Sequence, residues 1–265
     1  MNKLILVDSF YERGFFSSLN LTLLTIHYCN INNIIPIISD SIMLLYKPRF
    51  STKRPFSIFF GDIYSDDIDD SIEKIEISWV HNSNTLHFND ENVINSLREI
   101  NNILLKNLTP ELTEFINKKP FLFNDNLDLS IHYRGCDYLK NIPENHKQNL
   151  DPIQFIDQIK NMIDKVNIFV ATDDKFFINI LKSKEYNLCY FKDVYRLGPG
   201  RGTHMKTRLQ RLGFPALTSQ KRKALEVFRD VFWLSKSKCY IGSNSNLMYY
   251  SNLLNPKINF IKINE

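Results

Sequence analysis

Hydrophobic and polar positions in the first part of the chain follow strand-like and helix-like spacings in turn. Residues 4–7 form a short apolar run that ends at Asp8, which predicts a buried strand followed by a loop. Near-helical apolar spacing predicts a helix over residues 19–29. Residues 34–38 predict a second strand, in which Pro36 is tolerable only near a strand end or on an edge strand. This order of elements is the opening of an α/β domain.

The pattern is regular again in the second half. Asp151 and Pro152 suit the start of a helix, as an N-cap and a first helical residue. Alternating strands and helices predict a parallel sheet that binds ligands at the carboxyl ends of its strands. Strands are expected at 127–133, 166–171, 189–191 and 240–242, and helices at 91–107, 110–118, 152–165, 175–184, 220–237 and 247–254.

The stretch 124–128 is the predicted domain boundary, which gives an N-terminal domain over 1–125 and a C-terminal domain over 126–265. The acidic run 66–70 is expected to be a solvated loop. On the helix at 220–237, Glu226 and Asp230 are four residues apart and fit its solvated face.

Composition narrows the class of protein. A chain of 265 residues with 43% hydrophobic and 23% charged residues is typical of a globular protein. Its 33 basic and 29 acidic side chains leave a net charge of +4, too small to indicate a nucleic-acid partner. The four cysteines form no Cys-x-x-Cys pair, which argues against a zinc site, and such scattered thiols suit a reducing compartment better than a disulfide framework. No signal peptide and no apolar run of about 18 residues is present, so we expect a cytoplasmic protein without a membrane span.

Three polar clusters directly follow predicted strands of the second half, and we expect them to meet at one edge of the sheet. In the first cluster, the guanidinium of Arg134 offers a fork of donors suited to a diphosphate, which Asp137 could orient. A structural Arg134–Asp137 ion pair is the alternative. His132 is either a ligand-binding side chain or a core histidine bonded to a backbone carbonyl. The clusters are His132, Arg134 and Asp137; Thr172, Asp173 and Asp174; and Ser243, Asn244, Ser245 and Asn246.

The other two clusters also have two interpretations each. Adjacent carboxylates at Asp173 and Asp174 could bind a hard cation, or Thr172–Asp174 could cap the helix at Lys175, which we favour. The hydroxyls and amides of Ser243–Asn246 stand before a helix and suit an anion, although a simple helix cap would explain one of these residues.

Two glycine-containing loops are weaker candidates. The basic loop Gly198–His204 contains Arg201 and could order over a phosphate or sugar, or be a surface excursion. The segment from Gly14 to Asn20, at the end of the predicted loop 10–18, is either a tight turn before a helix or a wall of the cleft.

Together these segments resemble the fucosyltransferase superfamily that includes the α1,2-, α1,6- and protein O-fucosyltransferases. The first motif of that superfamily is present as His132-Tyr133-Arg134-Gly135-Cys136-Asp137. Ile168–Asp174 is similar to its second strand end, Leu234–Asn246 followed by Leu254–Pro256 to its third motif, and Gly14–Asn20 to its opening loop.

The resemblance implies an α/β fold of the GT-B-like type, with two facing Rossmann-like domains and a mainly parallel sheet in the second. It implies a metal-independent, inverting glycosyltransferase that needs no cofactor and moves fucose from GDP-fucose to a glycan or other hydroxyl acceptor. The N-terminal domain would hold the acceptor, Arg134 would bind the diphosphate, and the Ser/Asn turn would hold phosphate or sugar oxygens. The implied donor-binding set is Gly14, Asn20, His132, Arg134, Asp137, Thr172, Asp173, Arg201, His204, Ser243, Asn244, Ser245 and Asn246.

The sequence departs from the superfamily at two places. Many members have two adjacent arginines in the first motif, whereas Gly135 follows Arg134 here, so a second cation would come from Arg201 or His204. One branch places a catalytic glutamate shortly after the motif; this chain has Ile142 there and Glu144 two residues on. Glu144 is therefore the catalytic candidate beside Arg134, with the base unassigned.

Two rival functions remain open on the sequence. One is a metal-dependent glycosyltransferase in which Asp173 and Asp174 ligate the cation. The other is a non-catalytic protein that binds a nucleotide sugar.

Overall fold

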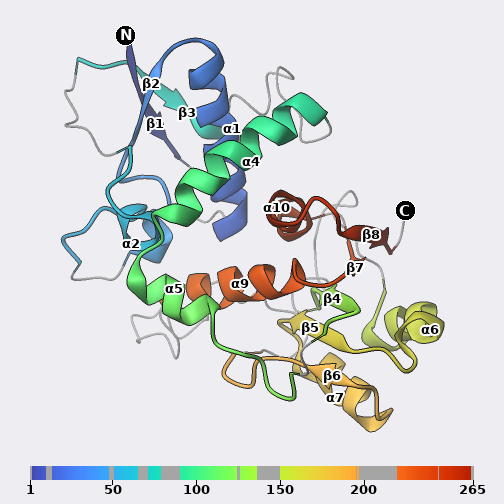
Figure 1. The fold of residues 1–265 in the computed structure, drawn as a ribbon. Helices are drawn as coiled ribbons and strands as arrows, with labels where there is room; N and C mark the ends of the chain where they lie inside the picture. The colour runs from blue at the N-terminus through green and yellow to red at the C-terminus, as the bar shows by residue number, and fades with distance from the viewer. Residues whose placement is uncertain are drawn as a thin grey trace. The chain divides into compact units, whose positions relative to one another are not determined.

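The computed structural model describes residues 2–9, 14–47, 51–64, 71–78, 90–123, 126–135, 150–194, 196, 220–243 and 245–263. Contacts divide the chain into two compact units, residues 1–115 with 219–225, and residues 116–218 with 226–265. The division falls within two helices, α5 (Pro110–Ile116) and α9 (Gln220–Leu234). The assignment of 1–125 to the acceptor and 126–265 to the donor stays a prediction. Figure 1 shows the elements of both units.

The first unit contains a three-stranded parallel sheet in the order β2-β1-β3. Its strands are β1 (Lys3–Val7), β2 (Ile35–Ile38) and β3 (Lys74–Glu76). Pro36 lies in an edge strand, as the sequence predicted, because an edge strand needs backbone donors on one side only. The sequence did not predict β3, whose side chains are exposed or half-buried and form no apolar run.

Helix α1 (Phe15–Ile31) starts earlier than the sequence predicted. The expected loop over 10–18 is wrong from Phe15 onward because this first turn is part of the core. Phe15 and Phe16 are both buried, and the Phe15 ring lies 5.3 Å from that of Tyr46 and 5.0 Å from that of Phe59. Ser18 adds a tie to the end of β1 by donating its hydroxyl to Asp8 over 3.1 Å.

The predicted helices at 91–107 and 110–118 are present as α4 (Glu91–Lys106) and α5. Asp90 caps α4 by accepting backbone N–H bonds at its side chain. This unit also contains two short elements, η1 (Leu44–Tyr46) and α2 (Ser57–Phe60). The acidic run 66–70 lies outside the described residues.

The second unit contains a five-stranded sheet in the order β6-β5-β4-β7-β8, and every pairing in it is parallel. This confirms the predicted parallel sheet. Only β8 was not predicted, because its side chains are exposed or half-buried. The strands are β4 (Leu129–Tyr133), β5 (Ile168–Thr172), β6 (Leu188–Cys189), β7 (Cys239–Gly242) and β8 (Asn259–Lys262).

Helices cover both faces of this sheet. Alternate residues of β4 and β5, such as Ile131 and Val170, form a core with α6 (Pro152–Ile163) and α7 (Lys175–Ser183). The opposite face carries Ser130, which donates its hydroxyl to the carbonyl of Leu234 in α9 over 3.0 Å. Figure 1 shows α9 on one side of β4 and β5 and the α6–α7 pair on the other. His132 alternates with Ile131 and therefore lies on the α9 face.

The helix starts were predicted from their capping residues. Asp151 forms a capping box with Gln154 at the start of α6, with Pro152 as the first helical residue. Asp174 caps α7, and Ser245 caps α10 (Asn246–Leu254). The predicted starts of α6 and α7 are confirmed, and α10 starts one residue before the predicted 247.

Candidate functional site

The three polar clusters meet at the carboxyl edge of the second sheet, as far as the structure describes them. Strand β4 is central, and β5 and β7 are its neighbours. In the register, Tyr133 pairs with Thr172 and His132 pairs with Gly242. Residues that follow these positions therefore emerge side by side. This confirms the expectation that they share one sheet edge, and we call this edge the candidate donor site.

Gly135 lies where the ends of β4 and β5 come together. Its backbone N–H donates to the Asp173 carboxylate over 3.0 Å. A Cβ at this position would lie 2.6 Å from both Asp174 Oδ2 and Tyr133 Cε1, and 2.9 Å from Asp174 Cβ. These distances leave no room for a side chain. An arginine beside Arg134 would therefore displace the start of α7, which gives a physical reason for the departure from the two-arginine motif.

His132 is buried and electrically neutral. Burial, with a further contribution from the charge of Arg134, lowers the pKa of its imidazole to about 3. Its Nδ1 atom is buried and has no hydrogen-bond partner among the described residues. His132 thus does not match a core histidine whose Nδ1 is bonded to a backbone carbonyl. A buried imidazole nitrogen without a partner is an unsatisfied polar atom, a feature that native sites use for catalysis or for a bound water or ion.

Thr172 and the two aspartates order the turn from β5 into α7. Asp174 accepts the backbone N–H of Phe176 over 2.7 Å, and Thr172 Oγ1 accepts that of Asp174 over 3.0 Å. The favoured interpretation of Asp174 as a helix cap is confirmed. Because Asp173 also accepts the N–H of Gly135, both carboxylates already have hydrogen-bond donors.

The turn from β7 into α10 contains Ser243 and Ser245. Ser245 is the N-cap of α10 and accepts the backbone N–H of Met248 over 3.3 Å, so one residue of the cluster acts as a simple cap. Ser243 is buried, and Asn246 is the first, exposed residue of the helix. A Cβ on Gly242 would lie 2.9 Å from the Tyr240 ring and 3.0 Å from the His132 carbonyl oxygen. Glycine here lets this turn approach β4 closely.

The remaining candidates do not belong to this edge or are not described. Gly14 and Asn20 belong to the first unit, where Gly14 is the N-cap of α1 and Asn20 is buried within the helix. A Cβ on Gly14 would meet nothing within 4 Å, so no crowding requires glycine there. Asp137, Glu144, Arg201, His204 and Asn244 lie outside the described residues.

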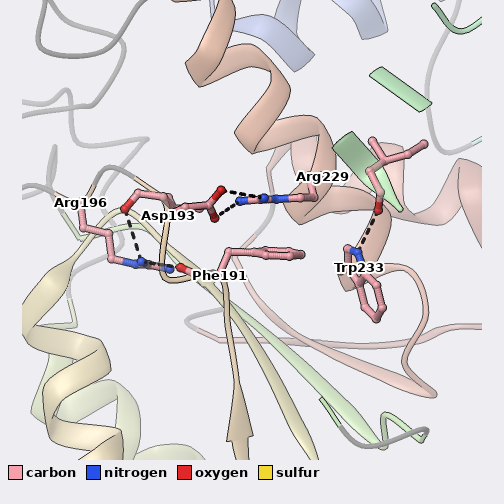
Figure 2. Close-up of polar contacts among 7 residues, drawn as sticks. Phe191, Asp193, Arg196, Arg229 and Trp233 are labelled. Carbon is pink, nitrogen blue, oxygen red and sulfur yellow. Dashed lines mark hydrogen bonds and ion pairs between the residues drawn. The ribbon is translucent and has the colours of Figure 1, made fainter. Parts of the chain in front are cut away.

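Sequence reasoning missed a buried charged cluster on α9. Figure 2 shows Arg229 reaching from the helix to Asp193, in the segment after β6. Two parallel hydrogen bonds of 2.7 and 3.2 Å join them, and the guanidinium carbon lies 3.6 Å from the centre of the Phe191 ring. The Arg229 side chain is 1% exposed. Arg196 donates to the Phe191 carbonyl over 2.8 Å and strengthens the same turn.

The expectation that Glu226 and Asp230 face solvent is wrong, since they are only 5% and 8% exposed. Both lie within electrostatic range of Arg196, whose charge helps to balance theirs. Burial nevertheless raises the pKa of Asp230 to about 7, against the opposing effect of Arg196 and Arg229. The sequence signals this cluster only by placing two adjacent charged residues, Arg229 and Asp230, between the apolar Phe228 and Val231.

The described residues contain neither a candidate metal site nor a candidate membrane span. No three His, Cys, Asp or Glu side chains of the described residues are grouped as a metal site would need. No described helix combines the length and apolarity that a bilayer crossing requires.

Comparison with known proteins gives a likeness in structure only. No protein-family model matches the chain, and no curated protein matches it by sequence. The crystal structure of NodZ α-1,6-fucosyltransferase soaked with GDP-fucose matches at 12% identity with a TM-score of 0.50, covering 99% of this chain and 95% of that one. The NodZ structure co-crystallized with GDP gives the same values. The structure of fucosyltransferase NodZ from Bradyrhizobium has 12% identity, a TM-score of 0.48 and coverages of 99% and 96%. The chain therefore has the α/β, GT-B-like fold of the fucosyltransferase NodZ.

Proposed function

We propose that the chain is a fucosyltransferase that moves fucose from GDP-fucose to a hydroxyl group of a glycan or another acceptor. One observation carries this proposal: the ends of three adjacent parallel strands bring Arg134, Asp173 and the Ser243–Ser245 turn to one edge. Open α/β sheets bind nucleotides at such an edge. Further support is the likeness in fold to NodZ structures, one soaked with GDP-fucose and one co-crystallized with GDP.

The reaction develops negative charge on the leaving diphosphate. The acceptor oxygen attacks C1 of fucose, the bond from C1 to the β-phosphate oxygen breaks, and GDP leaves with the electron pair. The hydroxyl proton passes to a general base, for which Glu144 is our proposal. Attack opposite to the leaving group inverts the configuration at C1.

Arg134 is the proposed partner of that diphosphate. A guanidinium binds phosphate oxygens through paired N–H donors, and its fixed charge stabilises the leaving group without reorganisation. The first turn of α10 adds backbone N–H groups and the positive end of its dipole next to Ser245. The proposal includes Arg201 or His204 as a second cation, because the crowding at Gly135 excludes one there.

The neutral imidazole of His132 suits a role in binding rather than in charge stabilisation. At a pKa of about 3, it stays uncharged at any pH at which the enzyme would work. Its Nδ1 can donate to or accept from a nucleotide group, depending on the tautomer. The acceptor is proposed to bind to residues 1–125.

A transfer assay with labelled GDP-fucose and an acceptor panel tests the proposal. Arg134→Ala should lower kcat by roughly 10²–10³-fold, the cost of one missing charge-stabilising donor, while the unfolding temperature stays unchanged. Lys184→Ala is the matched control, since Lys184 is an exposed cation on the same unit that pairs with Asp157. Wild-type turnover by Arg134→Ala would refute the role given to Arg134.

Chelation separates this mechanism from a metal-dependent one. With EDTA present, transfer should continue at the untreated rate. Complete loss of activity that Mn²⁺ restores would instead favour ligation by Asp173 and Asp174. The hydrogen bonds that these carboxylates already accept argue against that role.

Calorimetry separates an enzyme from a binding protein. Binding of GDP without transfer to any acceptor, and without hydrolysis of GDP-fucose, would favour a non-catalytic nucleotide-sugar-binding protein. We expect both GDP binding and slow donor hydrolysis, because the charge-stabilising groups also act when water is the acceptor.

A further inference from the structure

A groove of about 630 Å³ lies beside β6, the edge strand of the second sheet. Its walls come from residues 121–123 and 127, the starts of β5 and β6, and the last turn of α7. It shares no residue with the candidate donor site. Ile168 lines the groove and Thr172 lies at the donor edge, at opposite ends of β5, which separates the two places by roughly 13 Å.

The groove exists because the chain turns away from β6 at Leu122. Phe121 forms an antiparallel bridge with Tyr190 and donates its N–H to the Tyr190 carbonyl over 2.9 Å. Leu122 then adopts a φ of 60°, in the left-handed region, and its side chain is 65% exposed. The β-pairing that begins at Phe121 therefore stops after one residue. The space beside β6 where a further strand would pair is lined by side chains instead.

Two lysines in this groove have no carboxylate partner among the described residues. Lys182 Nζ lies 4.7 Å from the centre of the Tyr190 ring, and Lys192 Nζ lies 3.0 Å from that of Phe121. The two rings meet edge to face at 6.0 Å, so both ammonium groups flank one aromatic pair. Nearby surface lysines differ: Lys184 pairs with Asp157 and Lys238 with Asp128.

Besides the two lysines, the polar side chains that line the groove are amides. Asn167 and Asn187 line the groove, and each amide offers both a donor and an acceptor. Tyr186 and the 40%-exposed Phe121 add aromatic surface. Hydroxyl-rich rings fit such a lining, because amides bond sugar hydroxyls while aromatic rings cover the apolar faces of the sugar.

A peptide strand and a phosphate group fit this groove less well. A peptide strand added to β6 would need free backbone groups on that edge of the sheet. Two of these groups are already used, because Leu188 N–H donates to the Tyr186 carbonyl and the Tyr190 carbonyl accepts from Phe121. No arginine lines the groove within the described residues, and arginine is the side chain that matches a phosphate with paired donors. Two separate ammonium groups suit single carboxylates or sulfates that are spaced along a chain of sugars.

We propose that this groove is a binding site for an acidic saccharide, separate from the candidate donor site. Its aromatic pair and amides would contact the sugar rings, and Lys182 and Lys192 would pair with the carboxylate or sulfate groups. The groove would hold such a polymer to the protein whether or not the donor edge acts on it. The inference therefore does not depend on the proposed transfer reaction.

Calorimetric titration of the full chain with two matched hexasaccharides tests this site. Hyaluronan hexasaccharide carries a carboxylate on every second sugar, whereas hexa-N-acetylchitohexaose, called chitohexaose below, is neutral. Hyaluronan should bind, more weakly as salt rises, and chitohexaose should bind at least roughly tenfold more weakly, because it forms no ion pairs. The Lys182→Gln/Lys192→Gln double variant should lose roughly tenfold in hyaluronan affinity, and Lys184→Gln, the matched surface control, should not.

Each other result overturns the proposal. Undiminished binding by the double variant would place the saccharide elsewhere, and absence of hyaluronan binding by the wild type would leave no site. Poly-glutamate binding as tightly would mean that charge alone is recognised. Two further titrations separate this site from the donor site. In one, GDP is added to the double variant, and in the other, hyaluronan is added to Arg134→Ala. Each variant should retain the binding that the other loses.

Discussion

Gly135 donates its backbone N–H to the carboxylate of Asp173, which joins the end of the central strand β4 to the end of β5. The same glycine leaves no space for a Cβ against the cap residue of α7. The residue after Arg134 is thus fixed from two directions, by a hydrogen bond and by crowding. Arg134 emerges from a doubly fixed corner, which suits the role proposed for it as the partner of a diphosphate.

Gly135→Ala should destabilise the second unit by about 1–3 kcal/mol, because the new methyl group must displace the capping carboxylate of Asp174 or the ring of Tyr133. Urea unfolding measures the change. Gly14→Ala is the matched control, with open space at its Cβ and an expected cost below about 1 kcal/mol. Equal effects of the two variants would show that crowding at Gly135 is unimportant.

The buried, neutral His132 should lower the free energy of unfolding as the pH falls. Its folded pKa is about 3 and its ordinary pKa is 6.5, so between these values the unfolded chain binds a proton that the folded chain does not. Stability therefore falls as pH falls through this window. In His132→Gln the decline between pH 6.5 and pH 4 should be shallower, as measured by urea midpoints at several pH values. The exposed substitution Lys175→Gln should leave the pH dependence of the urea midpoint the same as in the wild type. The same unchanged pH dependence in His132→Gln would contradict the lowered pKa of His132.

Asp230 should have the opposite effect on stability. Its folded pKa is about 7 against 3.8 ordinarily, so the folded chain keeps a proton that the unfolded chain has lost. This contribution is complete below about pH 3.8 and is lost as pH rises through 7. Asp230→Asn cannot lose a proton, so its stability relative to the wild type should rise with pH up to about 7, by at most about 4 kcal/mol. A pH-independent difference would show that Asp230 is charged in the folded protein.

Arg229→Lys should destabilise the second unit by about 1–3 kcal/mol. Lysine cannot make the two parallel bonds to Asp193 or lie flat on Phe191, although it keeps the charge. Differential scanning calorimetry gives the change in Tm. Arg98→Lys, at a surface hydrogen bond to Asn95, should change the free energy of unfolding by less than about 0.5 kcal/mol. If Arg229→Lys lowered the free energy of unfolding no more than Arg98→Lys does, the paired hydrogen bonds of the guanidinium would be unimportant for stability.

The sequence predicted the buried parallel strands, the helix caps and the shared edge, because these depend on local patterns. Apolar runs such as Ile168–Ala171 indicate buried strands, and Asp151 and Asp174 mark helix starts through their own side chains. Once the sheet is parallel, residues after adjacent strands must come together. That inference needs no knowledge of packing.

The features that were missed depend on partners distant in the chain. Glu226 and Asp230 look like a solvated helix face until Arg196 is placed within range of them. The crowding at Gly135 involves Asp174, and the groove arises from one left-handed residue, Leu122. The edge strands β3 and β8 carry polar side chains, so neither produces an apolar signal. Local periodicity contains none of this information.

The strand order of the second sheet also has a consequence for how the protein is made. Ser130 in β4 and Cys239 in β7 are 109 positions apart, so the ribosome completes the central strand long before its second neighbour. Until β7 arrives, β4 has one open edge flanked by apolar side chains, which is a template for pairing with other chains. We expect chains that end before Cys239 to aggregate rather than remain in solution as inactive fragments.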